Sequence, residues 1–271
     1  MKKSIIALCV LFVLTGCQVA TLDETREKTI SFRVVQKQSM TRAALEDACS
    51  VLDYFRVTDG EVTSFLTQKS GEASFGTIAD EIPYGVHKLY FIGHKSEVTD
   101  FENGVASFDK VTDTFSHTLT LEVDTETESS HAIELLRNVA KFELVAVDAL
   151  PDNLATVEFT ITGADKNLDV DTGLGETENT QVKTIQVPET NIGKTNCTFS
   201  AYTFLLEDES MITIDFTAKD KDGNIIVSHT IENVEMQTNF ITRITGKVFG
   251  DQFGFSITAS TEWAGEIDYE F

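Results

Sequence analysis

A cysteine at the end of the first apolar stretch has the surroundings that predict the clearest chemistry in this sequence. Lys2 and Lys3 are followed by the uncharged residues 5–14 and by the run Leu14-Thr15-Gly16-Cys17. This layout is typical of a secretory signal peptide. Its last four residues resemble a bacterial lipobox, whose cysteine receives a diacylglycerol on its thiol before cleavage makes it the first mature residue. We expect residues 1–16 to be a lipoprotein signal peptide and Cys17 to carry lipid, palmitate included.

The alternative is an ordinary signal peptide that has a cysteine near its end by chance. The apolar stretch cannot itself be the anchor, because a membrane-spanning helix needs ~20 apolar residues. The chain turns polar directly after Cys17, with Gln18, Asp23 and Glu24. If the protein is held at a membrane, the lipid on Cys17 must hold it.

The charge of the chain excludes several classes of partner. The sequence has 44 acidic and 21 basic residues, which gives a formal net charge of −23. A surface this negative repels phosphates and anionic lipid headgroups. We therefore expect no nucleic-acid partner, and we interpret the acidity as a means of keeping an exposed protein soluble.

No catalytic motif stands out. The sequence lacks a G-x-S-x-G elbow, and "PETNIGKT" has Pro188 where a phosphate-binding loop needs its first glycine. None of the five histidines has zinc-ligand spacing; they are His87, His94, His117, His131 and His229. With 44 acidic residues, a glycosidase-type carboxylate pair cannot be recognised from proximity in the sequence. We expect a protein without enzymatic activity.

Two acidic clusters resemble calcium ligands in composition only. One contains Asp220, Asp222 and Asn224, and the other contains Asp169, Asp171 and Glu176. Neither fits the twelve-residue calcium loop with its final glutamate. We interpret the first as a hairpin turn and the second as a solvated loop, so that we expect no metal and no cofactor. Of the remaining cysteines, we expect Cys49 and Cys197 to be buried and free.

The elements that position these residues are predicted to be β-strands. Apolar residues alternate with a period of two, which is typical of half-buried strands, in residues 29–35, 88–94, 118–123, 157–162 and 212–218. Asp59-Gly60, Asn103-Gly104 and Asp222-Gly223 are hairpin signals, because these residues tolerate a positive φ. Only a short turn of helix is expected, from Ala43 to Ala48. The sequence predicts an all-β, antiparallel protein.

The length and strand count predict two tandem β-sandwich domains, with closed barrels as the alternative. The acidic, Ser/Thr-rich segment 124–132 is the best linker candidate. We therefore expect an N-terminal domain at residues 17–131 and a C-terminal domain at residues 132–271. Residues 167–179 are interpreted as a long loop in the second domain, where binding could occur.

Several segments resemble a known family, the fimbrial lipoproteins of the Bacteroidales type V pilus. "AIELLRNVAKFELVAVDALPDNLATVEFTITG" resembles the opening of that family's second domain, with its "L-x-R-x-x-A-K" strand followed by "D-x-x-P". "IPYGVHKLYFIGH", "NFITRITGKVFG" and the ending "FGFSITASTEWAGEIDYEF" resemble further segments of it. The resemblance covers most of the chain after residue 80. It implies two transthyretin-like domains and a structural role in a surface fimbria, at the outer membrane, with other fimbrial subunits as partners.

In that family, stalk subunits are cut by an arginine-specific protease after the first strand, and a strand from another subunit fills the groove. The resemblance makes Arg42 the possible cleavage site and Ile30, Phe32 and Val34 the candidate exchanged row. Anchor subunits keep this strand and their lipid. The chain is short for a stalk protein, so we favour an anchor or accessory subunit, with a polymerising stalk or tip subunit as the alternative.

A glycan-binding surface lipoprotein is the hypothesis from a different class. Such sites need exposed aromatic faces, and the chain has one tryptophan, Trp263, and five tyrosines. We expect Trp263 to cover the end of the core. An open face that carries Trp263 and two tyrosines would instead favour glycan binding.

Overall fold

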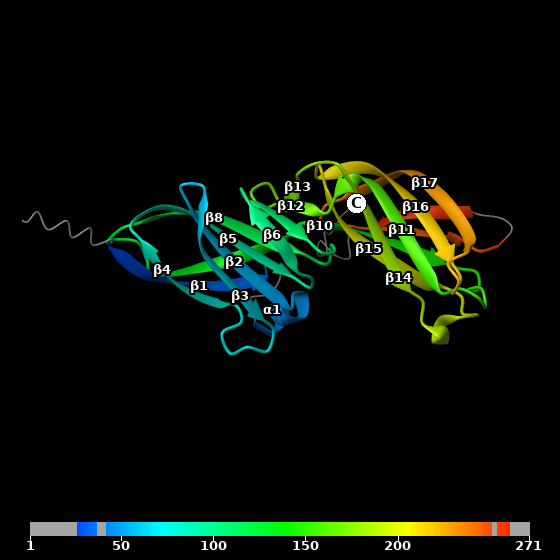
Figure 1. Ribbon diagram of the computed structural model, residues 1–271, viewed down its shortest axis with the longest axis horizontal. Coiled ribbons are helices and arrows are strands. Elements are labelled where there is room, and N and C mark those ends of the chain that lie inside the picture. The colour runs from blue at the N-terminus through cyan, green and yellow to red at the C-terminus, as the bar shows by residue number, and fades with distance from the viewer. Residues whose placement is uncertain (1–25, 37–41, 251–253, 261–271) are drawn as a thin grey trace, which may run out of the picture.

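The computed structural model describes residues 26–36, 42–250 and 254–260. Most of these residues lie in β-strands, arranged as two domains placed end to end (Figure 1). Within the described ranges, no helix is long and apolar enough to cross a membrane. The expected all-β fold with two tandem β-sheet domains is confirmed.

The first domain is a sandwich made by one folded path of strands in the order β3-β2-β5-β8-β9-β1-β4. The strands are β1 (Glu27–Gln36), β2 (Val51–Thr58), β3 (Glu61–Lys69), β4 (Thr77–Pro83), β5 (Gly85–His94), β8 (Phe115–Val123) and β9 (Ser130–Arg137). Helix α1 (Arg42–Ala48) follows β1. Because β9 pairs with β8 only at its C-terminal end and with β1 along the rest, the path folds over and encloses a core.

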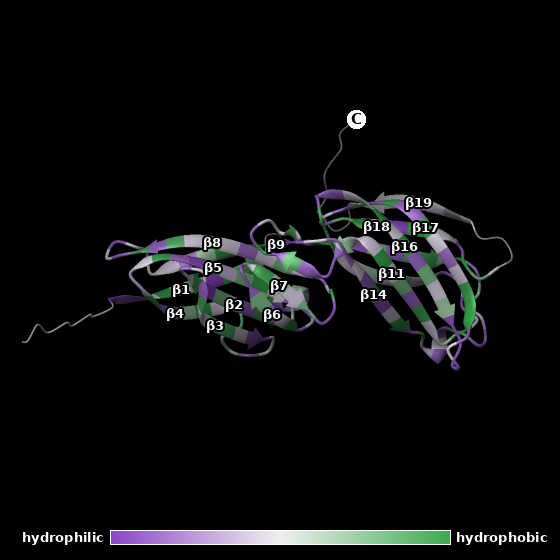
Figure 2. Ribbon diagram, turned by 45° about the horizontal axis from the view of Figure 1, so that its top comes forward, coloured by the Kyte–Doolittle hydropathy of each residue, from purple (hydrophilic) through white to green (hydrophobic). Residues whose placement is uncertain are grey.

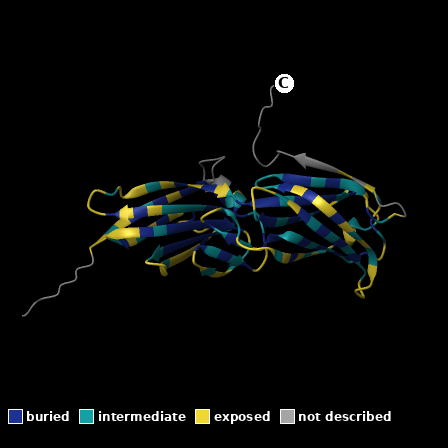
Figure 3. Cartoon of the chain, turned by 90° about the horizontal axis from the view of Figure 1, so that it is seen from above, coloured by how far each residue is buried: buried dark blue, intermediate teal, exposed yellow. Residues whose placement is uncertain are grey.

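The second domain is also a sandwich of β-strands. Its strands are β10 (Val139–Ala146), β11 (Thr156–Asp165), β14 (Asn179–Gln186), β15 (Cys197–Leu205), β16 (Glu209–Lys219), β17 (Ile225–Gln237), β18 (Ile241–Lys247) and β19 (Gly254–Ser260). They follow the order β17-β16-β11-β15-β10-β18-β19, with β14 paired to β11. A short 3-10 helix, η1 (Glu189–Asn191), follows β14. Hydrophobic and polar residues alternate along the strands of both domains (Figure 2), and the buried residues line both interiors (Figure 3).

A third, small sheet joins the two domains. It has the order β13-β12-β7-β6 and contains β6 (Val98–Glu102), β7 (Val105–Phe108), β12 (Asn167–Asp169) and β13 (Leu174–Gly175). The hairpin β6–β7 belongs to the first domain, whereas β12 and β13 lie in the connection between β11 and β14 of the second. Leu168 pairs with Ala106 at the centre of this junction sheet.

A separate apolar cluster packs around the junction sheet. Its buried residues come from both domains and include Tyr90, Phe108, Val139, Leu168 and Phe204. The rings of Phe108 and Phe204 lie 5.5 Å apart across the junction. The junction therefore has a dry core of its own in addition to backbone pairing.

Polar contacts close the edge of the junction. Lys88 Nζ lies 2.5 Å from Asp171 Oδ2, which joins β5 to the segment after β12. The backbone N–H of Val170 donates to the carbonyl of Gly104 at 2.9 Å. Gly104 has a φ of +84°, and a Cβ there would lie 2.9 Å from the Tyr90 hydroxyl, so this close approach requires glycine.

The sheet pairing differs from two expectations about the connections. Segment 124–129 is a tight turn between β8 and β9, and β9 pairs with β1 and β8, so the chain passes into the second domain at Asn138 rather than at residues 131–132. The interpretation of residues 167–179 as a long loop was wrong in part, because they contain β12 and β13 and bury Leu168 completely. The alternating Leu168 and Val170 were the signal for a strand.

The predicted hairpins and short helix are confirmed. Asp59 and Asn103 have positive φ values, as do Gly60, Gly104 and Gly223. The expected turn of helix at residues 43–48 is α1. Of the two free cysteines, Cys49 is buried as expected and Cys197 is partly exposed.

Candidate functional site

The candidate site is the place of β1 between β9 and β4, which we call the β1 seat. We chose it because the predicted exchange row lies on β1. β1 runs between two neighbours and is not an edge strand. It pairs in parallel with β9 from Ser31 to Gln36 and antiparallel with β4 from Glu27 to Arg33. Removing β1 would therefore leave unpaired backbone groups on both β9 and β4.

The apolar row of β1 fills the centre of the first core. Ile30 and Phe32 are fully buried, and Val34 is 3% exposed. The ring of Phe32 lies 5.3 Å from that of Phe91 and 6.0 Å from that of Tyr54. Burial of each such side chain stabilises the fold by about 1.5–3 kcal/mol, so the row contributes a large share of the stability of this domain.

The start of β1 is fastened by a lysine. Lys28 Nζ donates to the carbonyls of Asp124 at 3.4 Å and Thr125 at 3.0 Å, and also to that of Thr127. These three carbonyls belong to the turn between β8 and β9. Hydrogen bonds from a charged donor are stronger than neutral ones. Lys28 therefore holds the start of β1 against the turn between β8 and β9.

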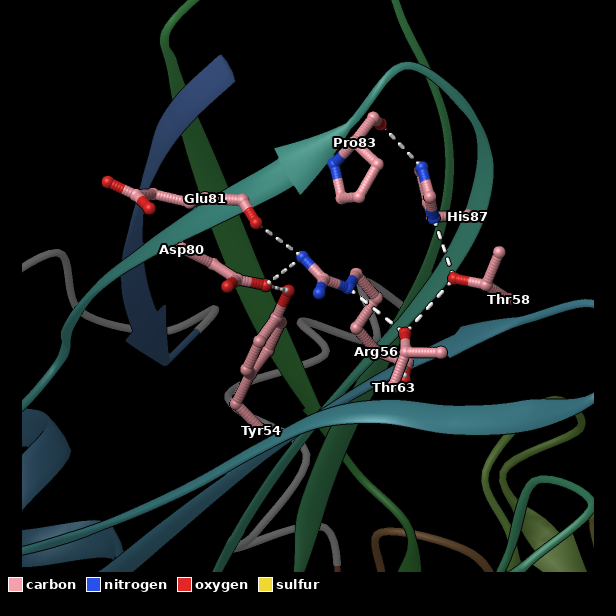
Figure 4. A network of polar contacts seen from close by, with 8 residues as sticks. All are labelled: Tyr54, Arg56, Thr58, Thr63, Asp80, Glu81, Pro83 and His87. Atoms are coloured by element: carbon pink, nitrogen blue, oxygen red, sulfur yellow. Dashed lines mark hydrogen bonds and ion pairs between the residues drawn. The ribbon is translucent and has the colours of Figure 1, made fainter. Parts of the chain in front are cut away.

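A partly buried polar network joins β4, one of the two neighbours of β1, to β2 (Figure 4). Arg56 Nη1 on β2 donates to Asp80 Oδ2 at 2.9 Å and to the carbonyl of Glu81 at 2.8 Å, both on β4. The Tyr54 hydroxyl donates to the same Asp80 oxygen at 2.9 Å. Burial, followed by the nearby charge of Asp80, raises the pKa of Tyr54, so this hydroxyl keeps its proton and acts as a donor.

The network ends at a buried histidine that connects the next turn. His87 Nε2 donates to the carbonyl of Pro83 at 2.7 Å, since a carbonyl can only accept. Its Nδ1 then accepts from the Thr58 hydroxyl at 2.8 Å. His87 thus has a structural role at the β4–β5 turn. It lies on the opposite face of β5 from His94, which pairs with Asp53 at 2.8 Å.

Helix α1 closes the other end of the β1 seat. Leu45 and Cys49 are buried in the same cluster as Ile30 and Phe32. Burial raises the pKa of the Cys49 thiol to about 12, so it stays protonated in the folded domain. Arg42, the predicted cleavage residue, is the first residue of this helix.

Cys17 and Trp263 lie outside the described residues. The structure places Arg42 at the first position of α1, directly after residues 37–41, and it brings Ile30, Phe32 and Val34 together in the core. The sequence analysis did not find Lys28, Arg56 or Asp80. Nothing in the local sequence marks Lys28, because its three acceptors lie about a hundred positions away along the chain.

The two acidic clusters have other partners. Asp220 Oδ1 accepts backbone N–H groups of Asp222 and Asn224, both at 2.9 Å, as a hairpin turn requires. Asp169 accepts the N–H of Asp171, and Asp171 pairs with Lys88. Across the described part of the chain, no group of three acidic, histidine or cysteine residues is arranged to hold a metal ion.

Solved structures share this fold at low sequence identity. A candidate adhesin from Bacteroides ovatus ATCC 8483 is 14% identical, with a TM-score of 0.54 over 82% of this chain and 88% of that chain. A candidate polysaccharide-binding protein from Bacteroides thetaiotaomicron VPI-5482 is 10% identical, with a TM-score of 0.52 over 88% and 97%. The fimbrial anchor protein Mfa2 from Porphyromonas gingivalis is 13% identical, with a TM-score of 0.49 over 87% and 98%.

A candidate adhesin and a candidate polysaccharide-binding protein thus share the fold of this chain, and a fimbrial anchor protein is among its structural neighbours, as the resemblance predicted. No curated protein matches the chain. The match to a family model is described as "Family of unknown function (DUF6562)" and spans residues 95–271, which begin just before β6 and include the whole second domain. The chain belongs to the family DUF6562.

Proposed function

We propose that this protein is a cell-surface lipoprotein of the outer membrane and an anchor or accessory subunit of a fimbria. Lipid on Cys17 would hold it at the membrane, and other fimbrial subunits would join it by β-strand pairing. The fold that it shares with a candidate adhesin supports a role in attachment. No step of this function requires a metal, a cofactor or catalysis.

The seat of β1 is the observation that carries the anchor assignment. The strand is paired on both sides, its row of Ile30, Phe32 and Val34 is buried, and Lys28 fastens its start. A subunit with this strand in place has no open groove to receive a strand from a neighbour. Partners would instead pair with the strands that end each path, β3 and β4 in the first domain and β17 and β19 in the second.

The mature N-terminus tests this proposal. Protein extracted from the membranes of its native cells should yield an N-terminal peptide that begins at acylated Cys17 and continues through β1, as mass spectrometry of a proteolytic digest would show. An N-terminus at Ala43 would contradict the anchor assignment. An unmodified Cys17 inside a longer peptide would contradict the lipid anchor alone.

The second candidate is a polymerising stalk or tip subunit, and the position of Arg42 favours it. Because this residue lies where α1 begins, one cut after it would detach β1 as a complete strand and would leave every other strand intact. A strand from a neighbouring chain could then take the place of β1 between β9 and β4.

Treatment of the lipid-free chain with an arginine-specific protease separates the two candidates. An Arg42→Lys variant is the matched control, since it keeps the charge and removes this cleavage site. Loss of residues 18–42 followed by a ladder of stable oligomers, absent from the control, would support polymerisation. A cut chain that stays monomeric with β1 bound, or that unfolds, would support the anchor.

A further inference from the structure

A groove runs along the outer face of the first domain, on the side of the sheet opposite the β1 seat. It has a volume of about 490 Å³ and lies between strands β2 and β3 and the segment that leads into β6. Its lining includes Asp53, Phe65, Thr67, Lys69, Ser96 and Glu97. Neither the junction sheet nor the seat of β1 uses these side chains.

An aromatic row ends at this groove. Phe101 of β6 stacks on Phe55 of β2 with ring centroids 3.9 Å apart, and Phe55 stacks on Phe65 of β3 at 4.8 Å. Phe55 is 6% exposed, whereas Phe65 at the open end of the row is 59% exposed. Stacking on Phe55 fixes the orientation of the Phe65 ring on the edge strand β3, and a large part of the apolar surface of this ring stays in water.

A fixed carboxylate forms the floor of the groove. Asp53 is 3% exposed, and its Oδ1 accepts the Thr67 hydroxyl at 2.5 Å while its Oδ2 faces His94 Nε2 at 2.8 Å. With both oxygens engaged, Asp53 orients the Thr67 hydroxyl and the His94 ring. Ser96 Oγ lies 3.5 Å from the other nitrogen of that ring. The floor is therefore polar and preorganised.

Two free charged side chains of opposite sign complete the rim. Lys69 and Glu97 are exposed, and neither side chain has a hydrogen bond or ion pair with any residue that the structure describes. A lipid or an apolar peptide would cover these charged and hydroxyl groups without offering them hydrogen bonds. An anion would meet Glu97, Asp53 and the overall charge of −23. A neutral ligand with one apolar face and many hydroxyls matches both the ring and the floor.

We propose that this groove binds a neutral saccharide, with a sugar ring packed against Phe65 and its hydroxyls hydrogen-bonded to Thr67, Ser96, Lys69 and Glu97. The proposal goes beyond the anchor function and does not depend on it. It would give a membrane-anchored subunit a glycan contact on the face that points away from β1.

The test uses the full chain in a detergent that carries no sugar, run in native gels cast with soluble starch, yeast mannan or dextran. We expect at least one of these neutral polysaccharides to retard the protein, and Phe65→Ala to weaken the apparent affinity at least tenfold. The matched control is Val182→Ala on β14, because Val182 is also 59% exposed and lies in the other domain. This control should bind as the parent does.

Because Phe65 is largely exposed, Phe65→Ala should keep the melting temperature of the parent, and this is measured on the same samples. A second variant, Glu97→Gln, should also weaken binding without unfolding the protein. The proposal would be overturned if none of the three polysaccharides retards the chain, or if both groove variants bind as tightly as the control. Neither result would affect the N-terminal analysis that tests the anchor.

Discussion

Each domain uses one charged side chain to bind backbone groups beside a strand, and the two side chains have opposite charge. In the first domain, the ammonium of Lys28 binds backbone carbonyls and fastens β1. In the second, the carboxylate of Asp148 binds the N–H groups of Val248 at 3.0 Å, Phe249 at 2.7 Å and Gly250 at 2.8 Å, directly after β18. Each group satisfies backbone atoms that have no partner in a sheet.

The two domains depend to different degrees on β1 and β19, the first and last strands that the structure describes. β1 lies between two strands and its apolar row is buried, whereas β19 pairs only with β18 at the end of its path. Loss of β1 would split a sheet, and loss of β19 would only expose the edge of β18. β1 is therefore an integral part of its domain, whereas β19 is an addition to the edge of its own.

The largest effect should come from the core of β1. Phe32→Ala should destabilise the first domain by about 3–5 kcal/mol, because it leaves a cavity beside Tyr54 and Phe91. Chemical denaturation of a chain that begins at residue 18 would measure this. Val182→Ala, an exposed site, should change the stability by less than about 0.5 kcal/mol.

Cys49 provides an independent readout of the same change. Its thiol is buried with Phe32 and has a pKa raised to about 12, so it should resist thiol reagents while the partly exposed Cys197 reacts. Phe32→Ala should accelerate the labelling of Cys49. A variant that loses less than about 1 kcal/mol and leaves Cys49 protected would show that β1 is not integral to its domain.

An intermediate effect is expected for Asp148→Asn. Burial alone would raise the pKa of Asp148, but the N–H groups of Val248, Phe249 and Gly250 together lower it. A carboxyl whose pKa is lowered by folding stabilises the fold above its unfolded pKa of about 3.9, and this stability is lost as the pH falls through the lower, folded value. The variant should therefore lose about 1–2 kcal/mol at pH 7 and less at acid pH.

Thermal unfolding at pH 7 and at about pH 3 would measure this difference. The gap between the parent and Asp148→Asn should narrow on acidification. A gap that is equally wide at both pH values would mean that the charge of Asp148 does not hold the segment after β18.

Most strands that the sequence analysis predicted are present because alternate side chains on one face are buried in a core. Val157, Phe159 and Ile161 of β11, for example, are all fully buried, as the period of two requires. β5 is buried on both faces, with Leu89 in the core of the first domain and Tyr90 in the junction cluster. The hairpins were equally predictable, because glycine and asparagine mark positive φ locally.

The site was less predictable, because its polar partners are far apart in the sequence. Asp80 lies 24 positions from Arg56, and neither position carries a sign of the other. The same holds for Leu168 and Ala106, whose pairing forms the junction sheet. Local periodicity indicates which face of a strand is buried, but not which strand of another domain covers it.

The smallest effect is expected at the start of β1. Lys28→Met removes the ammonium and keeps an apolar stem, and it should destabilise the first domain by about 0.5–1 kcal/mol because the site is only partly buried. Lys221→Met is the matched control, since Lys221 is 75% exposed and pairs with Glu189, which is 86% exposed. Denaturation of both variants side by side would measure the difference. Equal stability of the two would show that Lys28 does not fasten β1.

The strands of the junction sheet are synthesised at different times, because they come from distant parts of the chain. The strands of the first domain are complete once Arg137 has been synthesised, but β12, which covers Ala106 and the neighbouring Tyr90 and Phe108, comes later in the chain. A first domain that folds as it emerges therefore shows an apolar patch to its surroundings until Leu168 arrives. This interval is when the first domain is most exposed to aggregation, and an isolated first domain would remain in that state.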